Sequence, residues 1–332
     1  MRAILSRAPG GPDTLVLDDV AEPVPGPGEV RIAVRAVGIN YPDVLIIEDR
    51  YQFRPERPFS PGAEASGVID ALGSDVPDLA VGDRVLAMPG WGALAEKVVV
   101  RASRCSRLPA EMPFDAAAAF LMTYGTSYHA LVHRGRLAAG ETLLVLGAAG
   151  GVGLAAVEIG KALGARVVAA ASSADKVALA TAHGADAGLV YPTGPFDDVG
   201  RKALAEQFKA AVGRDGAGIV YDPVGGDYSE AALRAVGWKG RYLIVGFPAG
   251  IPKLPLNLVL LKGCDVAGVF WGAFVENERE AHLASLDALF RLYREGLIRP
   301  EVSARFPLER AGDAIAALAS RSARGKLVVT VS

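Results

Sequence analysis

The stretch from Thr142 to Gly153 constrains the fold most strongly, because an apolar run leads directly into a cluster of glycines. The run Leu143 to Leu146 shows no polar alternation, as expected for a parallel strand covered on both faces. Glycines let backbone approach phosphate oxygens, and a helix from about Val152 to Leu163 would direct its free N–H groups toward them. A tight turn without a ligand would leave the same pattern. The residues predicted to line a nucleotide site are Gly147, Ala148, Gly150, Gly151, Val152 and Gly153.

Composition narrows the class of protein. The 332 residues are 51% hydrophobic and 22% charged, which predicts a globular protein of two domains. The net charge of −2 argues against nucleic acid or an anionic membrane surface as a partner. No segment approaches about 18 uninterrupted apolar residues and the start has no apolar signal region, so we expect a cytoplasmic protein without membrane insertion. Cys105 and Cys264 are far apart, which predicts reduced thiols.

The first part of the chain has the pattern of an antiparallel β-domain. Short strands are separated by Pro and Gly clusters, at Val16 to Asp19, Glu29 to Ala36, Ala65 to Leu72, Arg84 to Met88 and Ala95 to Val100. Asp115 is well placed to cap a helix over Ala116 to Leu121.

Strands and helices then alternate, which predicts an α/β fold with a doubly wound parallel sheet. Later come an amphipathic helix that ends at Arg294, a strand at Val302 to Pro307, a short helix near Ala311 to Ala319 and a strand at Lys326 to Val331. The late strands have no strand–helix–strand partner in this sheet, so we expect the C-terminus to complete the first domain. The predicted domains are 1–120 with 275–332, and 121–274. The six sheet strands are expected at Thr142 to Leu146, Arg166 to Ala170, Gly188 to Tyr191, Gly218 to Tyr221, Arg241 to Val245 and Asp265 to Phe270.

The end of the second sheet strand indicates which nicotinamide cofactor binds. An NAD site usually has an acid there, whereas this chain has Ser172, Ser173 and, one helical turn on, Lys176. The lysine could pair with a 2′-phosphate, so NADPH is favoured over NADH. Lys176 could instead be a solvated helix residue, and Asp175 is expected only in a capping or dipole role. Tyr191, at the end of the third strand, could stack near the adenine or simply cap the strand.

Several motifs together resemble the medium-chain dehydrogenase/reductase superfamily, and within it the zinc-free NADPH:quinone oxidoreductases, the zeta-crystallin-like branch. They are Gly38 to Asp43, Tyr51, Pro61 to Gly67, Val81 to Val85, Thr123 to Thr126, the glycine turn and Tyr221 to Gly226. The resemblance covers nearly the whole chain. It implies a GroES-like catalytic domain, a Rossmann cofactor domain of strand order 3-2-1-4-5-6 and an active site in a cleft between the domains. It also implies a homodimer formed through the edge strand Val266 to Trp271.

Zinc chemistry is disfavoured by the same comparison. Zinc-dependent members carry Cys and His ligands where this chain has Asn40 and Ala63, and a further Cys near the helix at Thr123 that is missing here. Glu64 is expected to be structural. His129 and His133 have the spacing of metal ligands on a helix but lack a third ligand. No metal site is predicted.

A metal-free hydride transfer needs an electron-poor acceptor and a group that stabilises the charge developing on its oxygen. Tyr51 is the main candidate, because its phenol can donate a proton and related zinc-free enoyl-thioester reductases use a tyrosine in the matching loop. Asn40 can donate through its amide and Asp43 can orient its neighbours, although both also suit a turn around Pro42. Tyr41 and Trp271 are expected to line the substrate cleft. The residues expected to reach the cofactor are Thr126, Gly246, Phe247 and Lys326.

The predicted function is NADPH-dependent reduction of quinones or related α,β-unsaturated carbonyl compounds. An enoyl- or acrylyl-thioester reductase is the alternative reaction, and it would need a basic channel for a carrier phosphate. A structural or sensing protein that binds NADPH without catalysis is the alternative of another class. The presence of Tyr51 and Asn40 argues against that last reading.

Overall fold

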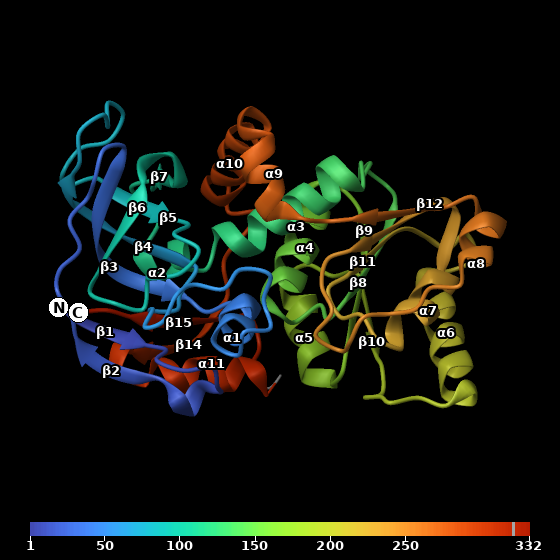
Figure 1. Cartoon of the computed structure of the whole chain (residues 1–332). Coiled ribbons are helices and arrows are strands. Elements are labelled where there is room, and N and C mark those ends of the chain that lie inside the picture. Colours follow the sequence, from blue (N-terminus) through green and yellow to red (C-terminus); the bar gives the residue numbers. More distant parts are fainter. Residues whose placement is uncertain (321–322) are drawn as a thin grey trace. The chain divides into compact units, whose positions relative to one another are not determined.

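The computed structural model describes residues 1–320 and 323–332 (Figure 1). Their contacts divide the chain into two units. Unit 1 is Met1–Met122 together with Pro300–Ser332, and unit 2 is Thr123–Arg299. The return to unit 1 therefore falls at residue 300 instead of the predicted 275, and the amphipathic helix ending at Arg294 is part of unit 2.

Unit 1 is built around a seven-stranded sheet in which the order β14-β15-β3-β4-β5-β7 forms a path and β6 pairs with β3. Its core contains Ile32, Val34, Ile69 and Leu94, all nearly inaccessible to solvent. Every strand predicted before residue 110 is present, and β1 and β7 were missed because they are short. The strands of the N-terminal segment are β1 (Arg2–Leu5), β2 (Val16–Asp19), β3 (Glu29–Gly38), β4 (Glu64–Leu72), β5 (Arg84–Ala87), β6 (Lys97–Arg101) and β7 (Cys105–Arg107).

The C-terminal segment completes this sheet. It forms β14 (Val302–Pro307), α11 (Ala311–Ala319) and β15 (Lys326–Thr330). As expected, β15 pairs antiparallel with β3, with Val328 opposite Gly38. Neither late strand joins the parallel sheet of unit 2, as expected; β14 and β15 instead pair with each other in parallel. The domain is thus antiparallel apart from this pair.

Two short helices complete the N-terminal part of unit 1, α1 (Tyr41–Ile47) and α2 (Phe114–Ala118). The predicted N-cap at Asp115 was wrong, since α2 begins two residues earlier than expected, at Phe114, with Pro113 as its N-cap. The Asp115 carboxylate instead accepts a hydrogen bond from Arg305 Nε at 2.9 Å. Single 3₁₀ turns lie at Pro12–Thr14, Ala102–Arg104 and Leu308–Arg310.

Unit 2 contains the predicted six-stranded parallel sheet, in the order β10-β9-β8-β11-β12-β13. In sequence order this is 3-2-1-4-5-6, so the α/β class and the doubly wound Rossmann topology are confirmed. Leu144, Val168, Val220 and Tyr242 lie in its core. The strands are β8 (Thr142–Leu146), β9 (Arg166–Ala171), β10 (Ala187–Val190), β11 (Ala217–Asp222), β12 (Val236–Ile244) and β13 (Asp265–Gly268).

A helical run from Leu121 to Arg134 leads into this sheet, with π-helical turns at Leu121–Gly125 and His129–Arg134 around α3 (Thr126–Tyr128). The last predicted strand was too long. It ends at Gly268, and Trp271 is the first residue of the following helix. The remaining helices are α4 (Gly151–Ala162), α5 (Ala174–Ala182), α6 (Asp198–Val212), α7 (Tyr228–Arg234), α8 (Leu256–Lys262), α9 (Trp271–Asn277) and α10 (Arg279–Arg294).

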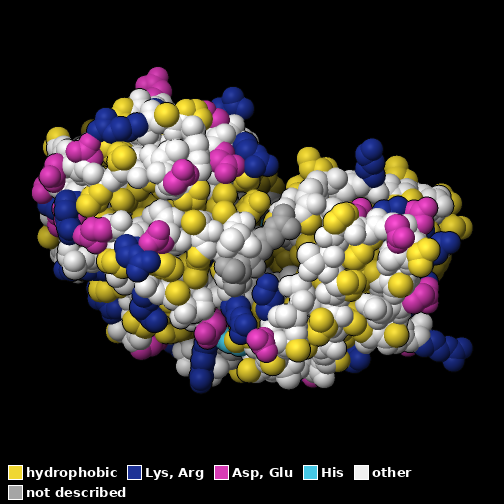
Figure 2. All heavy atoms as spheres, turned by 90° about the horizontal axis from the view of Figure 1, so that it is seen from below, with side chains coloured by type: hydrophobic (Ala, Val, Ile, Leu, Met, Phe, Trp, Pro, Cys, Tyr) yellow, Lys and Arg dark blue, Asp and Glu magenta, His cyan; other side chains and the backbone are white. Residues whose placement is uncertain are grey.

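The surface carries charges of both signs. On the face in Figure 2, lysine and arginine side chains are interspersed with aspartate and glutamate, in keeping with the net charge of −2. Within the described residues, no helix combines the length and the apolar character needed to cross a membrane.

Candidate functional site

The glycine turn of unit 2 has the backbone geometry that a phosphate site requires. Gly147 has φ of +56°, in the left-handed region that favours glycine. A Cβ on Gly153 would lie 2.2 Å from the Gly147 carbonyl oxygen, so only glycine permits this approach of helix to strand. The first α-helical hydrogen bond runs from Leu154 N to Gly150 O. The N–H groups of residues 151–153 therefore begin α4 without an intrahelical acceptor, which fits the pyrophosphate of a dinucleotide.

Tyr191 supports this turn from the interior. Its phenol is hydrogen-bonded to the Gly147 backbone, and burial raises its pKa well above the ordinary value. Its ring lies 5.0 Å from that of Tyr228 and 6.3 Å from that of Phe208, measured between centroids. A side chain enclosed in this way is not available to stack on an adenine. We therefore assign Tyr191 to positioning the turn.

At the end of β9, the two serines and the lysine singled out in the sequence lie close together. Lys176 Nζ donates to Ser172 Oγ at 3.3 Å. Ser173 is the N-cap of α5, and its Oγ accepts from Lys176 N at 3.4 Å. Asp175 lies in the first turn of α5, as expected. Two hydroxyls and an ammonium thus meet where an NAD-specific fold usually has a carboxylate.

The loop after β11 is organised by Asp222, which sequence reasoning did not single out. This buried carboxylate accepts from Val224 N at 2.8 Å, Gly225 N at 2.9 Å and Ser229 Oγ at 2.6 Å. An aspartate followed within four residues by Gly-Gly was the available signal, because a carboxylate at a strand end commonly accepts from the next N–H groups. Val224 in turn lies beside the glycine turn, 3.0 Å from where a Cβ on Gly147 would be.

The loop after β12 carries Gly246 and Phe247 and is bonded to the Asp222 loop. Ala249 N donates to Val224 O at 2.9 Å, and Gly226 N donates to Gly250 O at 2.7 Å. These bonds hold Phe247 with its side chain 43% exposed at the carboxyl end of the sheet. In doubly wound sheets the carboxyl ends of the strands are where ligands bind.

Thr126 is held near the same end of the sheet by its neighbour. Ser127 Oγ donates to Val152 O at 2.8 Å and lies 2.8 Å from the Tyr221 hydroxyl. These contacts fasten α3 to the first turn of α4. Thr126 is half-buried next to that junction.

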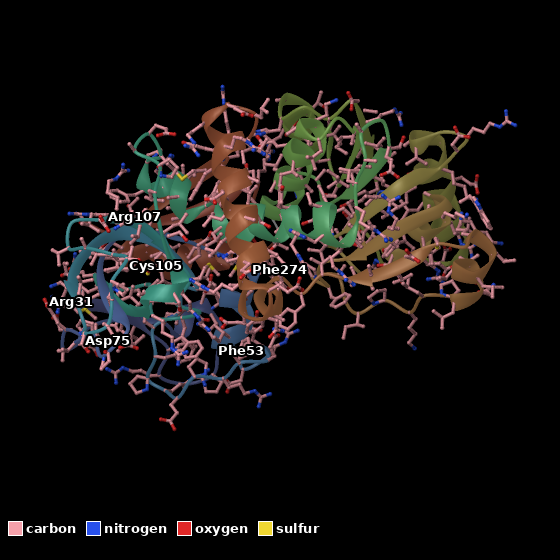
Figure 3. All side chains as sticks on the ribbon, turned by 90° about the horizontal axis from the view of Figure 1, so that it is seen from above. Arg31, Phe53, Asp75, Cys105, Arg107 and Phe274 are labelled. Carbon is pink, nitrogen blue, oxygen red and sulfur yellow. The ribbon has the colours of Figure 1, made fainter. Side chains whose placement is uncertain are left out.

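Trp271 does not line an open cleft within unit 2. Only 7% of its surface is exposed, and a Cβ on Gly125 would lie 2.8 Å from its ring. The ring also meets His282 edge to face, with 5.9 Å between centroids. A packing role therefore replaces the predicted substrate contact. His129 and His133 are also packed, with His129 stacked on Phe274 at 4.1 Å between centroids; Figure 3 labels Phe274 on α9.

In unit 1, three distant segments bring Asn40, Glu64 and Lys326 together in the interior. Lys326 Nζ donates to Glu64 Oε2 at 2.9 Å and to Asn40 Oδ1. Asn40 Nδ2 donates to Gly38 O at 3.0 Å and to Glu64 Oε2 at 3.1 Å. Glu64 Oε1 accepts from Met122 N at 2.8 Å. All three side chains are at most 7% exposed.

This arrangement revises two predicted roles. The Lys326 ammonium is engaged inside unit 1, which replaces the expectation that it reaches cofactor phosphates. Both amide hydrogens of Asn40 are also used, so its side chain has none left for a substrate oxygen. Sequence distance hid this cluster, since Lys326 is 286 residues from Asn40.

Asp43 ties the first turn of α1 to the loop before β4. Its carboxylate accepts from Asn40 N at 2.8 Å and from Gly62 N at 3.1 Å. Burial raises its pKa to about 6, although both N–H groups and the Lys326 charge act in the opposite direction. The orienting role expected of Asp43 thus has concrete partners.

Tyr51 lies in the loop after α1, half-buried against the core of unit 1. Burial raises the pKa of its phenol, and the nearby Asp43 carboxylate raises it further. Its ring meets that of Phe53 edge to face at 5.8 Å between centroids. Phe53, labelled in Figure 3, is 53% exposed and Tyr41 is half-buried at the start of α1. An aromatic surface with a phenolic hydroxyl is therefore present in this loop.

The donor set of unit 1 does not fit a zinc ion. Asn40 and Glu64 could offer oxygen ligands, but the Lys326 ammonium already donates a hydrogen bond to each of them. Its positive charge would repel a divalent metal ion. Over the described residues, no group of three or more His, Cys, Asp or Glu side chains could hold a metal ion.

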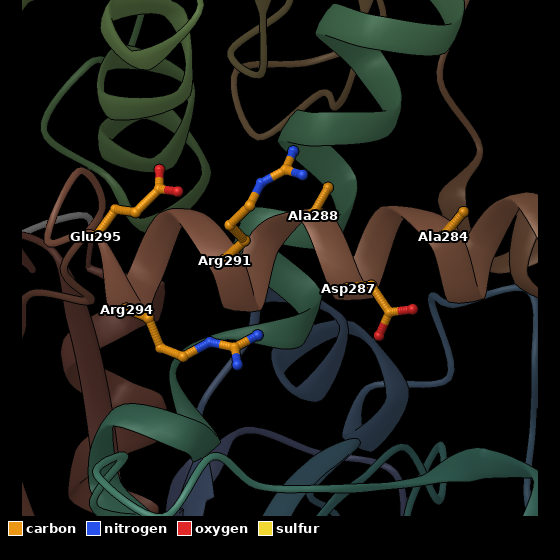
Figure 4. A pocket seen from close by; sticks show the side chains of 6 residues that line it. All are labelled: Ala284, Asp287, Ala288, Arg291, Arg294 and Glu295. Atoms are coloured by element: carbon orange, nitrogen blue, oxygen red, sulfur yellow. The ribbon is translucent and has the colours of Figure 1, made fainter.

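A depression lies over α10 in unit 2 (Figure 4). Its lining residues come from α10 and its C-cap residue Glu295, so they do not converge on a ligand from several directions. We assign no site to it. The residues are Ala284, Asp287, Ala288, Arg291, Arg294 and Glu295.

Comparisons with known proteins place the chain in a family. A family model described as "Alcohol dehydrogenase GroES-like domain" matches residues 26–110, and one described as "Zinc-binding dehydrogenase" matches residues 151–287. Quinone oxidoreductase-like protein 2 of Rattus norvegicus is 35% identical over 319 residues, which cover 96% of this chain and 89% of the relative. Quinone oxidoreductase of Pseudomonas aeruginosa is 35% identical over 332 residues, or 99% of each chain.

Among solved structures, Escherichia coli quinone oxidoreductase complexed with NADPH superimposes with a TM-score of 0.90. It is 28% identical, and the match covers 99% of this chain and 100% of that one. The predicted resemblance is thereby confirmed. The chain belongs to the medium-chain dehydrogenase/reductase superfamily and, within it, to the quinone oxidoreductase-like branch.

Proposed function

We propose that this protein reduces quinones or related α,β-unsaturated carbonyl compounds with NADPH and without a metal ion. The observation that carries the proposal is the donor set of unit 1. The Lys326 ammonium donates to Asn40 Oδ1 and Glu64 Oε2, so a positive charge already lies where a metal ion would bind these oxygens. Without a Lewis acid, the acceptor itself must spread the incoming charge. Quinones and enones do so through conjugation. The similarity to quinone oxidoreductases over nearly the full chain supports the same substrate class.

NADPH supplies the hydride when bound. The N–H groups of residues 151–153 would hold its pyrophosphate, and Ser172 and Lys176 would hold its 2′-phosphate. Thr126, Gly246 and Phe247 are the proposed contacts toward the nicotinamide end. The Escherichia coli relative whose structure contains NADPH supports this choice of cofactor.

Tyr51 is the proposed proton donor to the reduced oxygen. A tyrosine phenol keeps its proton at neutral pH and can donate it to an oxygen on which negative charge develops. Asp43 would orient the loop and keep Tyr51 protonated. Phe53 and Tyr41 would offer aromatic surface to a flat acceptor.

The test is NADPH and NADH oxidation by the purified protein with a panel of quinones, enones and enoyl thioesters. We expect turnover with quinones or enones, and a preference for NADPH. Tyr51→Phe should lower kcat by about 10²-fold while leaving NADPH affinity unchanged, because general acid catalysis contributes on that order. Lys176→Ala should weaken NADPH binding by about tenfold and leave NADH binding unchanged, in line with one lost charge-assisted hydrogen bond.

Each part of the proposal has its own contrary result. NADPH binding without turnover of any acceptor would contradict the enzymatic proposal and favour a structural or sensing role. Turnover restricted to enoyl thioesters would move the substrate class to that alternative. Equal use of NADH and NADPH would contradict the assignment of Ser172 and Lys176.

We also propose a homodimer formed through β13, the edge strand of the unit 2 sheet. An unpaired edge beside exposed apolar side chains favours association with a second copy. Light scattering after size exclusion should show a dimer, and Val266→Pro should yield monomers. A monomeric wild type would contradict this proposal. The exposed side chains are Trp238, Leu256, Leu260, Leu261 and Phe270.

A further inference from the structure

The buried ion pair of unit 1 is assembled from three segments that lie far apart in the sequence. Lys326 begins β15, Glu64 begins β4, and Asn40 follows β3. Glu64 has no solvent exposure and Lys326 has 5%. Each Glu64 oxygen accepts at least one hydrogen bond, and Asn40 uses its carbonyl oxygen and both amide hydrogens. A charge pair with these contacts has a defined orientation.

Stability alone is a weak reason for such a pair. Two charges lose their hydration on burial, and apolar side chains of similar volume often stabilise a core equally well. The residues around the pair are nevertheless tightly packed. A Cβ on Gly38 would lie 1.8 Å from the Ala118 carbonyl oxygen and 3.0 Å from Glu64 Oε2, so no larger side chain fits there. The geometry held by the pair therefore needs another explanation.

The pair is continuous with the loop that carries the proposed proton donor. Lys326 and Glu64 fix the side chain of Asn40, the residue from which α1 starts. The Asn40 backbone N–H is bonded to Asp43, whose other oxygen holds Gly62 N. Asp43 also lies close enough to Tyr51 for its charge to act on the phenol. A short chain of hydrogen bonds thus joins the ammonium to Asp43 in the first turn of α1, the helix that precedes the Tyr51 loop.

We infer that Lys326 is a positioning residue for the reduction, and that its ammonium supplies the fixed internal cation that a metal ion supplies in a zinc-binding dehydrogenase. It holds Asn40 and Glu64 from one side, as a metal would hold its ligands, and so sets the start of α1 and the Tyr51 loop. The role in catalysis rests on the proposed function. The cation role does not depend on it.

The test compares wild type, Lys326→Ala and the double variant Glu64→Gln/Lys326→Met, which removes both charges while keeping side-chain volume. We expect the double variant to fold and to bind NADPH within about twofold of wild type, because the cofactor residues lie in unit 2. Its kcat for a quinone should fall at least about tenfold, with KM for NADPH unchanged, as expected when only a transition-state interaction is lost. Methylammonium or ethylammonium should raise both the Tm and the kcat of Lys326→Ala, whereas tetramethylammonium should raise neither.

Other outcomes overturn the inference. A double variant with wild-type kcat would remove the positioning role. Failure of both small ammonium ions to stabilise Lys326→Ala would remove the cation role, as would a wild type that retains one equivalent of added Zn²⁺ after desalting and loses it on Glu64→Gln. A wild type that turns over no acceptor would contradict the proposed function instead, and the ammonium and zinc measurements would still decide the cation role.

Discussion

Glu64 and Glu158 are both buried carboxylates, one in each unit, and they are neutralised in different ways. Glu64 lies against a lysine ammonium and an asparagine amide. Glu158 is 5% exposed, and its Oε2 accepts from the Tyr124 hydroxyl at 2.6 Å and from Arg299 N at 2.9 Å. His183 Nδ1 lies 2.6 Å from its Oε1.

The two units offset the free-energy cost of burying a negative charge in different ways. Unit 1 uses a full opposite charge, so loss of the lysine strands a carboxylate in the core. Unit 2 distributes the charge over several hydrogen-bond donors, so loss of one leaves the others in place. Single substitutions should therefore have much larger effects around Glu64 than around Glu158.

Lys326→Met should have the largest effect. It leaves Glu64 buried without a cation, and we expect the free energy of unfolding to fall by about 3–5 kcal/mol in urea denaturation. Glu64→Gln/Lys326→Met should regain most of that loss. Additive losses in the double variant would show that the two charges are not coupled and would break the comparison.

Glu158→Gln should cost less, about 2–3 kcal/mol, because it weakens several charge-assisted hydrogen bonds without stranding a charge. Tyr124→Phe removes one donor and should cost about 1–2 kcal/mol by the same measurement. A loss on Tyr124→Phe as large as that on Lys326→Met would mean that Glu158 depends on one partner after all.

The two units also contain groups that respond to acid with opposite sign. Burial raises the pKa of Asp43 in unit 1 to about 6, so the folded state takes up its proton first and gains stability as the pH falls through 6. Burial lowers the pKa of His129 in unit 2 to about 4, with His133 and Arg134 adding to the shift. The unfolded chain then takes up that proton first, and stability is lost as the pH falls below about 6.5.

His129→Phe isolates this smallest effect. Phenylalanine keeps a ring against Phe274 and removes the titration, so the unfolding free energy of the variant relative to wild type should rise by about 1–2 kcal/mol between pH 6.5 and 5. Urea denaturation at several pH values measures it. His129 Nδ1 is buried and has no hydrogen-bond partner among the residues that the structure describes, in agreement with a neutral ring. A difference that does not change with pH would contradict this assignment.

Local sequence patterns were sufficient for most of the fold. The strand at Thr142–Leu146 and its glycine turn are coded by consecutive residues, and both were predicted at their observed positions. Trp271 shows the limit of prediction from local patterns. An apolar run does not indicate that the strand ends at Gly268 and that a helix follows. The short strands β1 and β7 depend on neighbours supplied by other segments.

In the candidate site, too, contacts between nearby residues were predictable and contacts between distant segments were not. Ser172 and Lys176 are four residues apart across the start of α5, so their contact is local in sequence. The contacts of Lys326 with Asn40 and Glu64 span 286 and 262 residues. The pairing of β3 with both β15 and β4 brings them together, and no spacing rule encodes it. The sequence also could not show that the Asn40 amide is already fully hydrogen-bonded, because its partners come from distant parts of the chain.

Unit 2 is one uninterrupted stretch of chain, and residues close to its two ends meet on a single oxygen atom. Tyr124, near its beginning, and Arg299, at its end, both donate to Glu158 Oε2. A segment whose ends converge can be removed or exchanged whole, since a short linker is enough to rejoin the flanking chain. Unit 2, which we propose binds the nucleotide, is in evolutionary terms a single insertion into the chain of unit 1. In engineering terms, a replacement for unit 2 would be joined after Met122 and before Pro300.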